Sequence, residues 1–557
     1  MFSAVTQFDA LFVGSGVNAL TGAAMLARGG WRVCVLERNE VLGGAIRTSG
    51  DLTEPGFTHE LMASWHPLFA GSAAYAELGD DLRRHGLEYL NTDAPTATLF
   101  PDGEAAFLST SAEANAAEFD RHAAGDGAAW RRQFELFMGS ADLSFGVLSA
   151  ELWSRQGLGL ARKAYSELGR RGLLEFAGTS LVSARDWLAS TFASERAHGL
   201  LAPWVLHTGL GPEQASGGFM TQVIACALQL GGMPVPKGGG TALVEALAAI
   251  VREGGGELRT GADVERVLLS SGRAYGVRLA GGERIHAGKG VVASVTPTQL
   301  YGRLLAKEET PTPIWDAARR FRYGRAGMQI HLALRESPRW ASPEAERLAR
   351  TAIVHVISGL DGVSRAVNEA ERGLLPAEAT IVAGQPCAVE ESRAPAGASI
   401  LWIQLQELPR KPTGDALGEL DVGDGRWTEE LREAYADRIL ARLGTQITNL
   451  QQATIKRVVL SPADLEGLNC NLVGGDIYAG SCSLDQNLLW RPTGRMPGHR
   501  TAIDDLWHIG ASTHPGPGLG AGSGYLVAKQ LLPRQRPGTP AGRALQTLDR
   551  VLAGLRS

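Results

Sequence analysis

The residues best suited to chemistry lie near the N-terminus, where a glycine-rich turn reads Gly14-Ser15-Gly16-Val17-Asn18-Ala19. In this pattern Gly14 makes a tight turn, Gly16 lets the backbone approach a diphosphate, and Ala19 allows close packing of a helix on a strand. The turn follows an apolar run at 9–13 and opens a helical stretch at 18–28. The helix would direct unpaired N–H groups and the positive end of its dipole at the phosphates. The turn therefore predicts a dinucleotide site.

The residues that follow the turn support this interpretation. A second β-rich run at 31–36 ends at Glu37, 23 positions past Gly14. An acid at this distance accepts hydrogen bonds from ribose hydroxyls. The alternative is a glycine-bearing turn of an α/β protein without a cofactor, but strand, turn, helix, strand and acid all occur in the expected order. The pair Gly43-Gly44 comes shortly afterwards and suits an extended FAD better than NAD.

Several segments resemble one family. Near the N-terminus these are Leu36-Glu37-Arg38, Leu42-Gly43-Gly44-Ala45 and Gly56-Phe57. Towards the C-terminus they are Gly475–Tyr478, Ser483–Gln486, Arg491-Pro492 and Gly510–Gly516. Together they resemble the phytoene desaturase-like family of FAD oxidoreductases, and most closely its branch of pyridine nucleotide-disulfide oxidoreductase domain-containing protein 2.

The resemblance implies a set of FAD-binding residues. For the ADP half and the segment leading to the ring these are Gly14, Ser15, Gly16, Asn18, Ala19, Glu37, Arg38, Gly43, Gly44, Ala45, Arg47, Ser64 and Val264. For the ribityl chain and the ring they are Gly510, Ala511, Ser512, Gly518, Leu519, Gly520 and Ala521. Two positions depart from the wider pattern, because Ser512 and Thr513 stand where an aspartate is common and Ala45 stands where an arginine is common.

Candidate catalytic residues are fewer, since the flavin itself accepts the hydride. His207, within an apolar loop-like segment, and His514, within the turn expected beside the flavin, are the candidates for a base or a positioning group. His59, Glu60 and His66 fall near the expected position of the ring. A hydrogen-bonded core histidine is the ordinary alternative at each histidine. The sequence contains no HExxH motif and no defensible Ser–His–Asp arrangement, so we expect no metal.

These residues require an α/β (overall α+β) fold of the two-dinucleotide-domain flavoprotein kind: a Rossmann-type FAD-binding domain and a discontinuous mixed substrate domain with a helical insertion. We expect the FAD-binding domain at 1–95, 225–300 and 495–533, and the substrate domain at 96–224 and 301–494. A largely helical block is expected at 80–214. Further expected elements are a helix at 241–252, strands at 257–259, 264–269, 274–279, 328–334, 352–357, 400–405 and 506–509, and a helix at 524–532.

Composition limits the remaining options. With 557 residues, a net charge of −5 and no basic run, the chain gives no reason to expect nucleic acid as a partner. The five cysteines are scattered and form no CxxC pair, which indicates reduced thiols. We expect a cytoplasmic protein without a signal or a transmembrane segment. In the tail at 534–557, an amphipathic stretch at 542–555 would form a peripheral membrane contact, a surface helix or an oligomer contact. The oligomeric state stays open, and a homodimer is one option.

The predicted function is that of an FAD-dependent dehydrogenase, desaturase or oxidase. It would transfer a hydride from a largely apolar organic substrate to flavin N5. No second dinucleotide unit is visible, so oxygen, a quinone or an electron carrier is the expected electron acceptor. Three alternatives remain at this point: a redox-neutral isomerase of the carotenoid kind, a flavin amine oxidase, and a non-catalytic flavoprotein scaffold.

Overall fold

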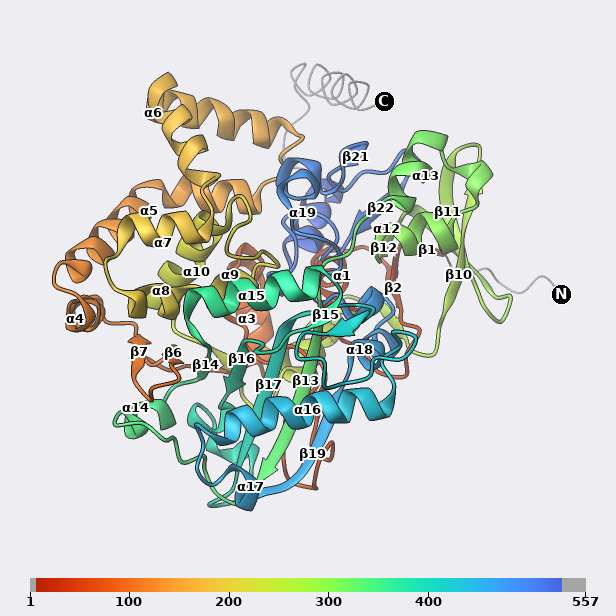
Figure 1. The fold of residues 1–557 in the computed structure, drawn as a ribbon. Coiled ribbons are helices and arrows are strands. Elements are labelled where there is room, and N and C mark those ends of the chain that lie inside the picture. The colour runs from red at the N-terminus through yellow and green to blue at the C-terminus, as the bar shows by residue number, and fades with distance from the viewer. Residues whose placement is uncertain (1–6, 533–557) are drawn as a thin grey trace.

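The computed structural model describes residues 7–532, which form two seven-stranded sheets with helices around them (Figure 1). The first sheet has the order β10–β11–β12–β1–β2–β9, and β22 also pairs with β12. Its strands are β1 (Gln7–Val13), β2 (Val33–Leu36), β9 (Glu257–Arg259), β10 (Val264–Ser270), β11 (Arg273–Leu279), β12 (Arg284–Ser294) and β22 (Leu506–Ile509).

Five strands of the first sheet run parallel. β1 lies between β2 and the second half of β12, so that Phe12 is level with Val35 on one side and Val292 on the other. β9 extends the sheet beyond β2, and β22 extends it beyond β12. β10, β11 and the first half of β12 form an antiparallel meander. Because parallel strands share one carboxyl edge, the loops after β1, β2 and β22 meet at the same side of the sheet.

Both faces of the first sheet are covered, as near-continuous apolar strands require. Phe12 and Val35 pack in one core with the helices α1 (Val17–Arg28), α3 (Ala73–Arg84), α11 (Thr241–Glu253) and α19 (Gly522–Leu531). Leu11 and Val13 point the other way. They share a second core with the antiparallel meander and with η1 (Leu300–Leu304) and α13 (Thr312–Arg319).

The second sheet is mixed, in the order β19–β13–β17–β16–β14–β6–β7. Its strands are β6 (Thr96–Leu99), β7 (Ala105–Leu108), β13 (Ala326–Leu334), β14 (Ile353–Val356), β16 (Ile381–Gly384), β17 (Ser399–Leu408) and β19 (Thr454–Leu460). One face packs on α16 (Glu429–Gly444), because Leu401, Ile403 and Leu405 share a core with Leu431 and Ile439. Figure 1 shows α16 lying across this sheet.

The opposite face of the second sheet is covered by a helical layer. Val382 and Trp402 pack there with Val205 and Leu206 in a separate core. The layer consists of α4 (Ala112–His122), α5 (Asp126–Ser149), α6 (Arg155–Ser180), α7 (Ala184–Thr191), α8 (Glu195–Leu201), α9 (Pro203–Leu206), α10 (Gly217–Gly231) and α15 (Gly359–Glu371). Figure 1 shows α6 on the outside of this layer, beyond α5.

Shorter elements connect these layers. They are α2 (Pro67–Ala70), α12 (Pro297–Gln299), α14 (Ala345–Ala349), α17 (Leu450–Ala453), α18 (Pro462–Leu468), η2 (Lys307–Glu309), η3 (Pro386–Ala388), η4 (Glu391–Arg393), η5 (Val473–Gly475), η6 (Leu484–Gln486) and η7 (Leu488–Trp490). The short strand pairs are β3 (Thr48–Ser49) with β4 (His59–Glu60), β5 (Tyr89–Leu90) with β8 (Val235–Pro236), β15 (Leu374–Leu375) with β18 (Gly414–Asp415), and β20 (Pro492–Thr493) with β21 (Met496–Pro497).

The predicted fold class is confirmed, with two local corrections. The block at 80–214 is not helical throughout, because β6 and β7 form a hairpin at the edge of the second sheet. The segment before His207 is the short helix α9 rather than a loop. The division into domains stays a prediction, and the amphipathic stretch at 542–555 lies outside the described residues. Within residues 7–532, no helix is both long and apolar enough to cross a membrane.

Candidate functional site

The turn after β1 leaves open space where a diphosphate would lie. Gly14 has φ +92°, and a Cβ there would stand 3.2 Å from the backbone oxygen of Ser294, so the turn requires glycine. A Cβ on Gly16 would meet no atom within 4 Å. Gly16 is also the N-cap of α1, and no side chain caps this helix end. Ala19 is fully buried against the sheet. The first N–H groups of α1 therefore face an open cradle suited to an anion.

Glu37 lies at the end of β2 beside this turn. Its carboxylate accepts hydrogen bonds from the Ser15 amide at 3.0 Å, the Ser15 hydroxyl at 2.6 Å and the Asn39 amide at 2.9 Å. The Ser15 hydroxyl in turn accepts from the Gly43 amide at 3.1 Å. These bonds fix the carboxylate of Glu37 at the carboxyl edge of the sheet, where a ribose would meet it.

The predicted glycine pair lies directly against the phosphate turn. Gly43 pairs with Gly16 in a single bridge, and a Cβ on Gly44 would stand 3.0 Å from the Gly16 Cα. Ala45 follows, and its carbonyl accepts a hydrogen bond from Ala63. Beyond it, Arg47 donates to the Leu468 carbonyl at 2.9 Å. The structure thus brings this loop and the phosphate turn together.

Three further predicted residues differ in their surroundings. Ser64 is 2% exposed, and its hydroxyl has no hydrogen-bond partner within the protein. Arg38 is exposed and lies beside Cys470. Val264 is buried at the start of β10, and just before it the Ala262 amide donates to the Glu37 carbonyl at 2.8 Å. Val264 is therefore near the end of the site where the ribose acid lies, whereas Arg38 points towards solvent.

The C-terminal segment closes the same edge of the sheet. The Ser523 hydroxyl donates to Asn18 at 2.8 Å and accepts from the Gly510 amide at 2.9 Å, which ties the last helix to the first. Arg491, fully buried, donates to the Ala511 carbonyl at 2.7 Å, and the Ser512 hydroxyl donates to the Ala479 carbonyl at 2.7 Å.

The turn that leads into α19 has an unusual backbone. Gly518, Leu519 and Ala521 all have positive φ, and Gly520 stands between the last two. Ala521 is the N-cap of α19, and no side chain caps this helix end either. A second helix N-terminus therefore offers backbone donors, next to the cradle formed by Gly16.

Most candidate catalytic groups that the sequence places near the expected ring have partners within the protein. Glu60 accepts hydrogen bonds from the Arg393 guanidinium at 2.9 Å and from the Gly240 amide at 2.8 Å. Arg393 also donates to Glu390 at 2.7 Å. His59 bonds to Thr53 at 2.8 Å and His66 to Tyr89 at 3.2 Å. Glu60 is thus part of a buried ion-pair network rather than a free base.

His514 and His207 differ from each other. Both ring nitrogens of His514 are buried without a partner in the protein, and burial lowers its pKa to about 4. His207, partly exposed at the end of α9, bonds through Nε2 to Nε2 of His355 at 3.0 Å. The Gln406 amide nitrogen lies 3.2 Å from Nδ1 of His207 and 2.9 Å from the Gln404 oxygen. Trp204 packs against His207, with ring centroids 4.4 Å apart.

His355, Gln404 and Gln406 were not among the predicted residues. They lie on β14 and β17, and their side chains face the helical layer rather than α16. The signal was present as a single histidine within the apolar run Ala352–Ile357, where strand alternation sets it opposite Val354 and Val356. Burial lowers the pKa of His207 to about 3 and holds that of His355 well below its usual range. The cluster is therefore uncharged at neutral pH.

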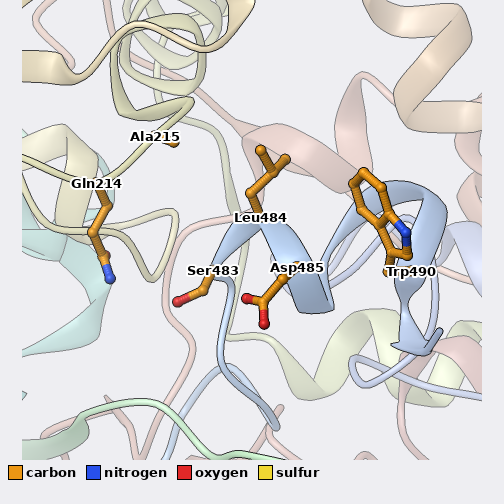
Figure 2. A pocket seen from close by; sticks show the side chains of 6 residues that line it. All are labelled: Gln214, Ala215, Ser483, Leu484, Asp485 and Trp490. Atoms are coloured by element: carbon orange, nitrogen blue, oxygen red, sulfur yellow. The ribbon is translucent and has the colours of Figure 1, made fainter.

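A surface cavity of about 590 Å³ lies near this cluster along the chain. Its lining residues are Gln214, Ala215, Ser483, Leu484, Asp485 and Trp490. Figure 2 shows Leu484 and Asp485 on η6, Ser483 just before it, and Gln214 on a separate loop. Gln214 belongs to the loop that follows His207, and it bonds to the Gly211 amide. A second cavity of about 500 Å³ shares Gln214 and is also lined by Gly211 and Ser364, so it lies closer along the chain to His207 and His355.

A phosphate turn on a parallel sheet, an acid at the next strand and a second sheet with an uncharged polar face define an FAD-dependent oxidoreductase. Residues 20–368 match the family described as flavin containing amine oxidoreductase, and the chain belongs to this family. The cofactor is FAD. The residues present fit it, since the Gly16 cradle is open, both helix ends are uncapped and the Ser64 hydroxyl has no protein partner.

Known proteins similar to the chain agree with this conclusion. It is 25% identical to a limonene dehydrogenase subunit of Castellaniella defragrans, covering 95% of each chain. It is also 25% identical to pyridine nucleotide-disulfide oxidoreductase domain-containing protein 2 of Rattus norvegicus, covering 94% and 93%. A solved structure of putrescine oxidase with putrescine bound shares the fold, with a TM-score of 0.60, 15% identity and coverage of 95% and 100%. The predicted kinship with phytoene desaturase-like FAD oxidoreductases is confirmed.

Proposed function

We propose that this oxidoreductase removes hydrogen from a C–C bond of a largely apolar small molecule. The substrate would lie beside the interface of the second sheet and the helical layer, at the end of α9, where His207 is partly exposed. The observation that carries the proposal is the uncharged wall formed by His207, His355 and Gln406. The name of one relative, limonene dehydrogenase, describes a dehydrogenase that acts on limonene, an apolar molecule.

The wall favours an uncharged substrate. A buried ammonium group needs a carboxylate or an aromatic cage. On β13, β14, β16 and β17, which are described in full, no side chain that faces the helical layer is acidic. Glu407, the one acid of β17, falls on the α16 side and accepts from the Thr380 amide. An amine would therefore gain little binding free energy at this wall. For a hydrocarbon, the free-energy cost of leaving water there would be small.

His207 is the member of the pair that a substrate can reach, because His355 is fully buried. Donation from Gln406 to Nδ1 of His207 leaves the proton on Nε2, and that proton is shared with His355. His355 and Gln406 thus fix the tautomer and the orientation of the imidazole. We propose that His207 contacts the substrate and that the other two are positioning residues. When bound, FAD would accept one hydrogen as a hydride. The second hydrogen would leave as a proton to solvent, since both ring nitrogens of His207 are already hydrogen-bonded.

The test is anaerobic mixing of the purified FAD-loaded protein with limonene and, separately, with putrescine or cyclohexylamine. We expect bleaching of the flavin band by the hydrocarbon and a product two hydrogens lighter. His207→Gln should slow bleaching by roughly a hundredfold while the flavin spectrum of the resting protein stays unchanged. A product of unchanged mass would indicate isomerisation and contradict the proposal.

Oxidation of a C–N bond is the second candidate, favoured by the description of the matching family. Bleaching by the amines and not by the hydrocarbon would establish it. For the electron acceptor we propose oxygen or a quinone. Mixing the reduced protein with each in turn should restore the flavin band within one turnover, and a failure of both would call for a protein carrier.

A further inference from the structure

The helix α6 is mostly exposed. It spans 26 residues, and Ala164 is its one buried residue. The backbone of Gly169 is not helical, so the helix bends there. A helix that packs on a protein core normally buries one apolar stripe. On α6 most apolar side chains face outward instead, which calls for something outside the described chain to cover them.

Three exposed apolar side chains of α6 form one stripe. Leu158 is 55% exposed, Tyr165 59% and Leu168 37%. Their spacing of seven and three residues places them on one face of the helix before the bend. Beyond the bend, Leu174 and Leu181 are also exposed, at 64% and 49%. We call Leu158, Tyr165 and Leu168 the α6 stripe.

The charges around the stripe are mainly positive. Five basic and two acidic residues lie on α6: Arg155, Arg162, Lys163, Arg170, Arg171, Glu167 and Glu175. The chain leaves the described region beside this helix, because Gln530 at the end of α19 bonds to Glu151 between α5 and α6 at 3.3 Å. The sequence beyond it, 533–557, has five arginines and one aspartate. Because both segments are basic, charge repulsion disfavours the packing of residues 533–557 on the stripe. An anionic surface would attract both α6 and this segment.

Two exposed tryptophans lie between the start of α6 and the cavity. Trp153, 43% exposed just before α6, donates its indole N–H to the Leu489 carbonyl at 2.7 Å. The next residue, Trp490, is 41% exposed and lines the cavity with Gln214 (Figure 2). Tryptophan is the side chain that most favours the boundary between lipid headgroups and acyl chains.

We infer that the α6 stripe, with Trp153 and Trp490, is a docking surface for an anionic lipid bilayer. The apolar stripe enters the acyl boundary, and Arg162 and Arg170 meet the headgroups. Docking in this way sets the cavity mouth against the bilayer, so that an apolar substrate enters from the lipid. That last step rests on the proposed function, whereas the docking itself does not.

The test is flotation of the full-length FAD-loaded protein with vesicles of phosphatidylcholine alone or mixed with phosphatidylglycerol. The stripe variant is Leu158→Ser with Tyr165→Ser and Leu168→Ser. The matched control is Leu417→Ser, which changes a leucine that is 50% exposed away from α6. We expect the unchanged protein and the control to float with the anionic vesicles, more weakly at high salt. The stripe variant should bind roughly tenfold or more weakly and keep its flavin spectrum.

Several outcomes would overturn the inference. One is equal binding by the stripe variant and the control, and another is no preference for anionic vesicles. Loss of binding on deletion of 533–557, with the stripe variant still bound, would assign docking to the tail. A solution mass of two chains that falls to one in the stripe variant, without vesicle binding, would make α6 a contact between copies. Because flotation needs no turnover, it is independent of whether the C–C reaction is correct.

Discussion

At the scale of single residues, a substitution at Gly16 distinguishes an effect on FAD binding from an effect on folding. A side chain on Gly16 would enter open space, so it should not disturb the folded chain. It would occupy the cradle of a phosphate instead. We therefore predict that Gly16→Val folds as the parent does and retains almost no FAD after purification. The check is the ratio of flavin to protein absorbance, together with thermal unfolding of both proteins stripped of flavin.

Gly50→Val is the matched control, because Gly50 also has open space around it but lies away from the turn. It should retain FAD fully. Normal FAD content in Gly16→Val would mean that the turn does not hold the diphosphate.

The network of Glu60, Arg393 and Glu390 concerns stability rather than chemistry. Arg393 is 1% exposed, so Arg393→Met leaves two buried carboxylates without a cation. We predict that the free energy of unfolding falls by about 3–5 kcal/mol. The surface pair of Arg426 and Asp424 gives the control, since Arg426→Met should cost less than about 1 kcal/mol. Denaturant unfolding of both variants measures the difference, and equal losses would refute the role of the network.

Which residues the sequence could predict depends on how local their role is. Gly14, Gly16 and Glu37 belong to one βαβ unit, so their spacing alone placed them together. His207 was identified only by its type, because its partner His355 lies 148 residues away. Their contact exists because α9 packs on the face of β14 that carries His355, and no local pattern contains that information.

At the scale of elements, the crossing of α1 and α19 is the closest helix contact described. A Cβ on Gly524 would stand 1.7 Å from the backbone oxygen of Asn18. We predict that Gly524→Ala separates the two helices, lowers the free energy of unfolding by about 3 kcal/mol or more and weakens FAD retention. Thermal unfolding and flavin content measure both effects.

Gly139 in α5 provides a control of opposite sign. A Cβ there meets no atom within 4 Å, so Gly139→Ala should stabilise the helix by roughly 0.5–1 kcal/mol. A similar result for both alanine variants would show that the α1–α19 crossing can accommodate a Cβ at position 524.

Element prediction failed where tertiary pairing decides the structure. Six of the seven strands of the first sheet and the helix α11 were expected from the sequence, whereas β12 was not among the expected strands. β6 and β7 are only four residues each and stand between helical stretches, so the sequence pattern predicted a largely helical block there instead of two strands. They are strands because Thr96–Leu99 pairs with β14, which is more than 250 residues away along the chain.

At the scale of the whole molecule, buried histidines should make stability depend on pH. Burial lowers the pKa of seven of them: His59, His66, His207, His331, His355, His508 and His514. The unfolded chain binds protons near pH 6.5, whereas the folded chain does so only near pH 4 or below. Their contribution to the free energy of unfolding is therefore complete above about pH 6.5. It is lost as the pH falls below that value, by up to about 1.4 kcal/mol per histidine per pH unit.

The measurement is the unfolding midpoint between about pH 7 and pH 5. His331→Gln should flatten the decline, while His85→Gln, a surface change beside Glu253, should leave it unchanged. A midpoint that stays constant through this range would contradict the prediction. The cytoplasmic location expected from the sequence stays a prediction as well.

The bond between Asn18 and Ser523 also has a consequence for how the protein is made. The two residues are 505 positions apart, and synthesis of that length takes roughly 25–100 s. Throughout that time the nascent first helix lacks the partner that completes its apolar side. The flavin site is therefore assembled only after Ser523 has left the ribosome, so that cofactor loading follows the synthesis of α19, and truncated products without α19 should be recognised by chaperones and proteases as unfinished.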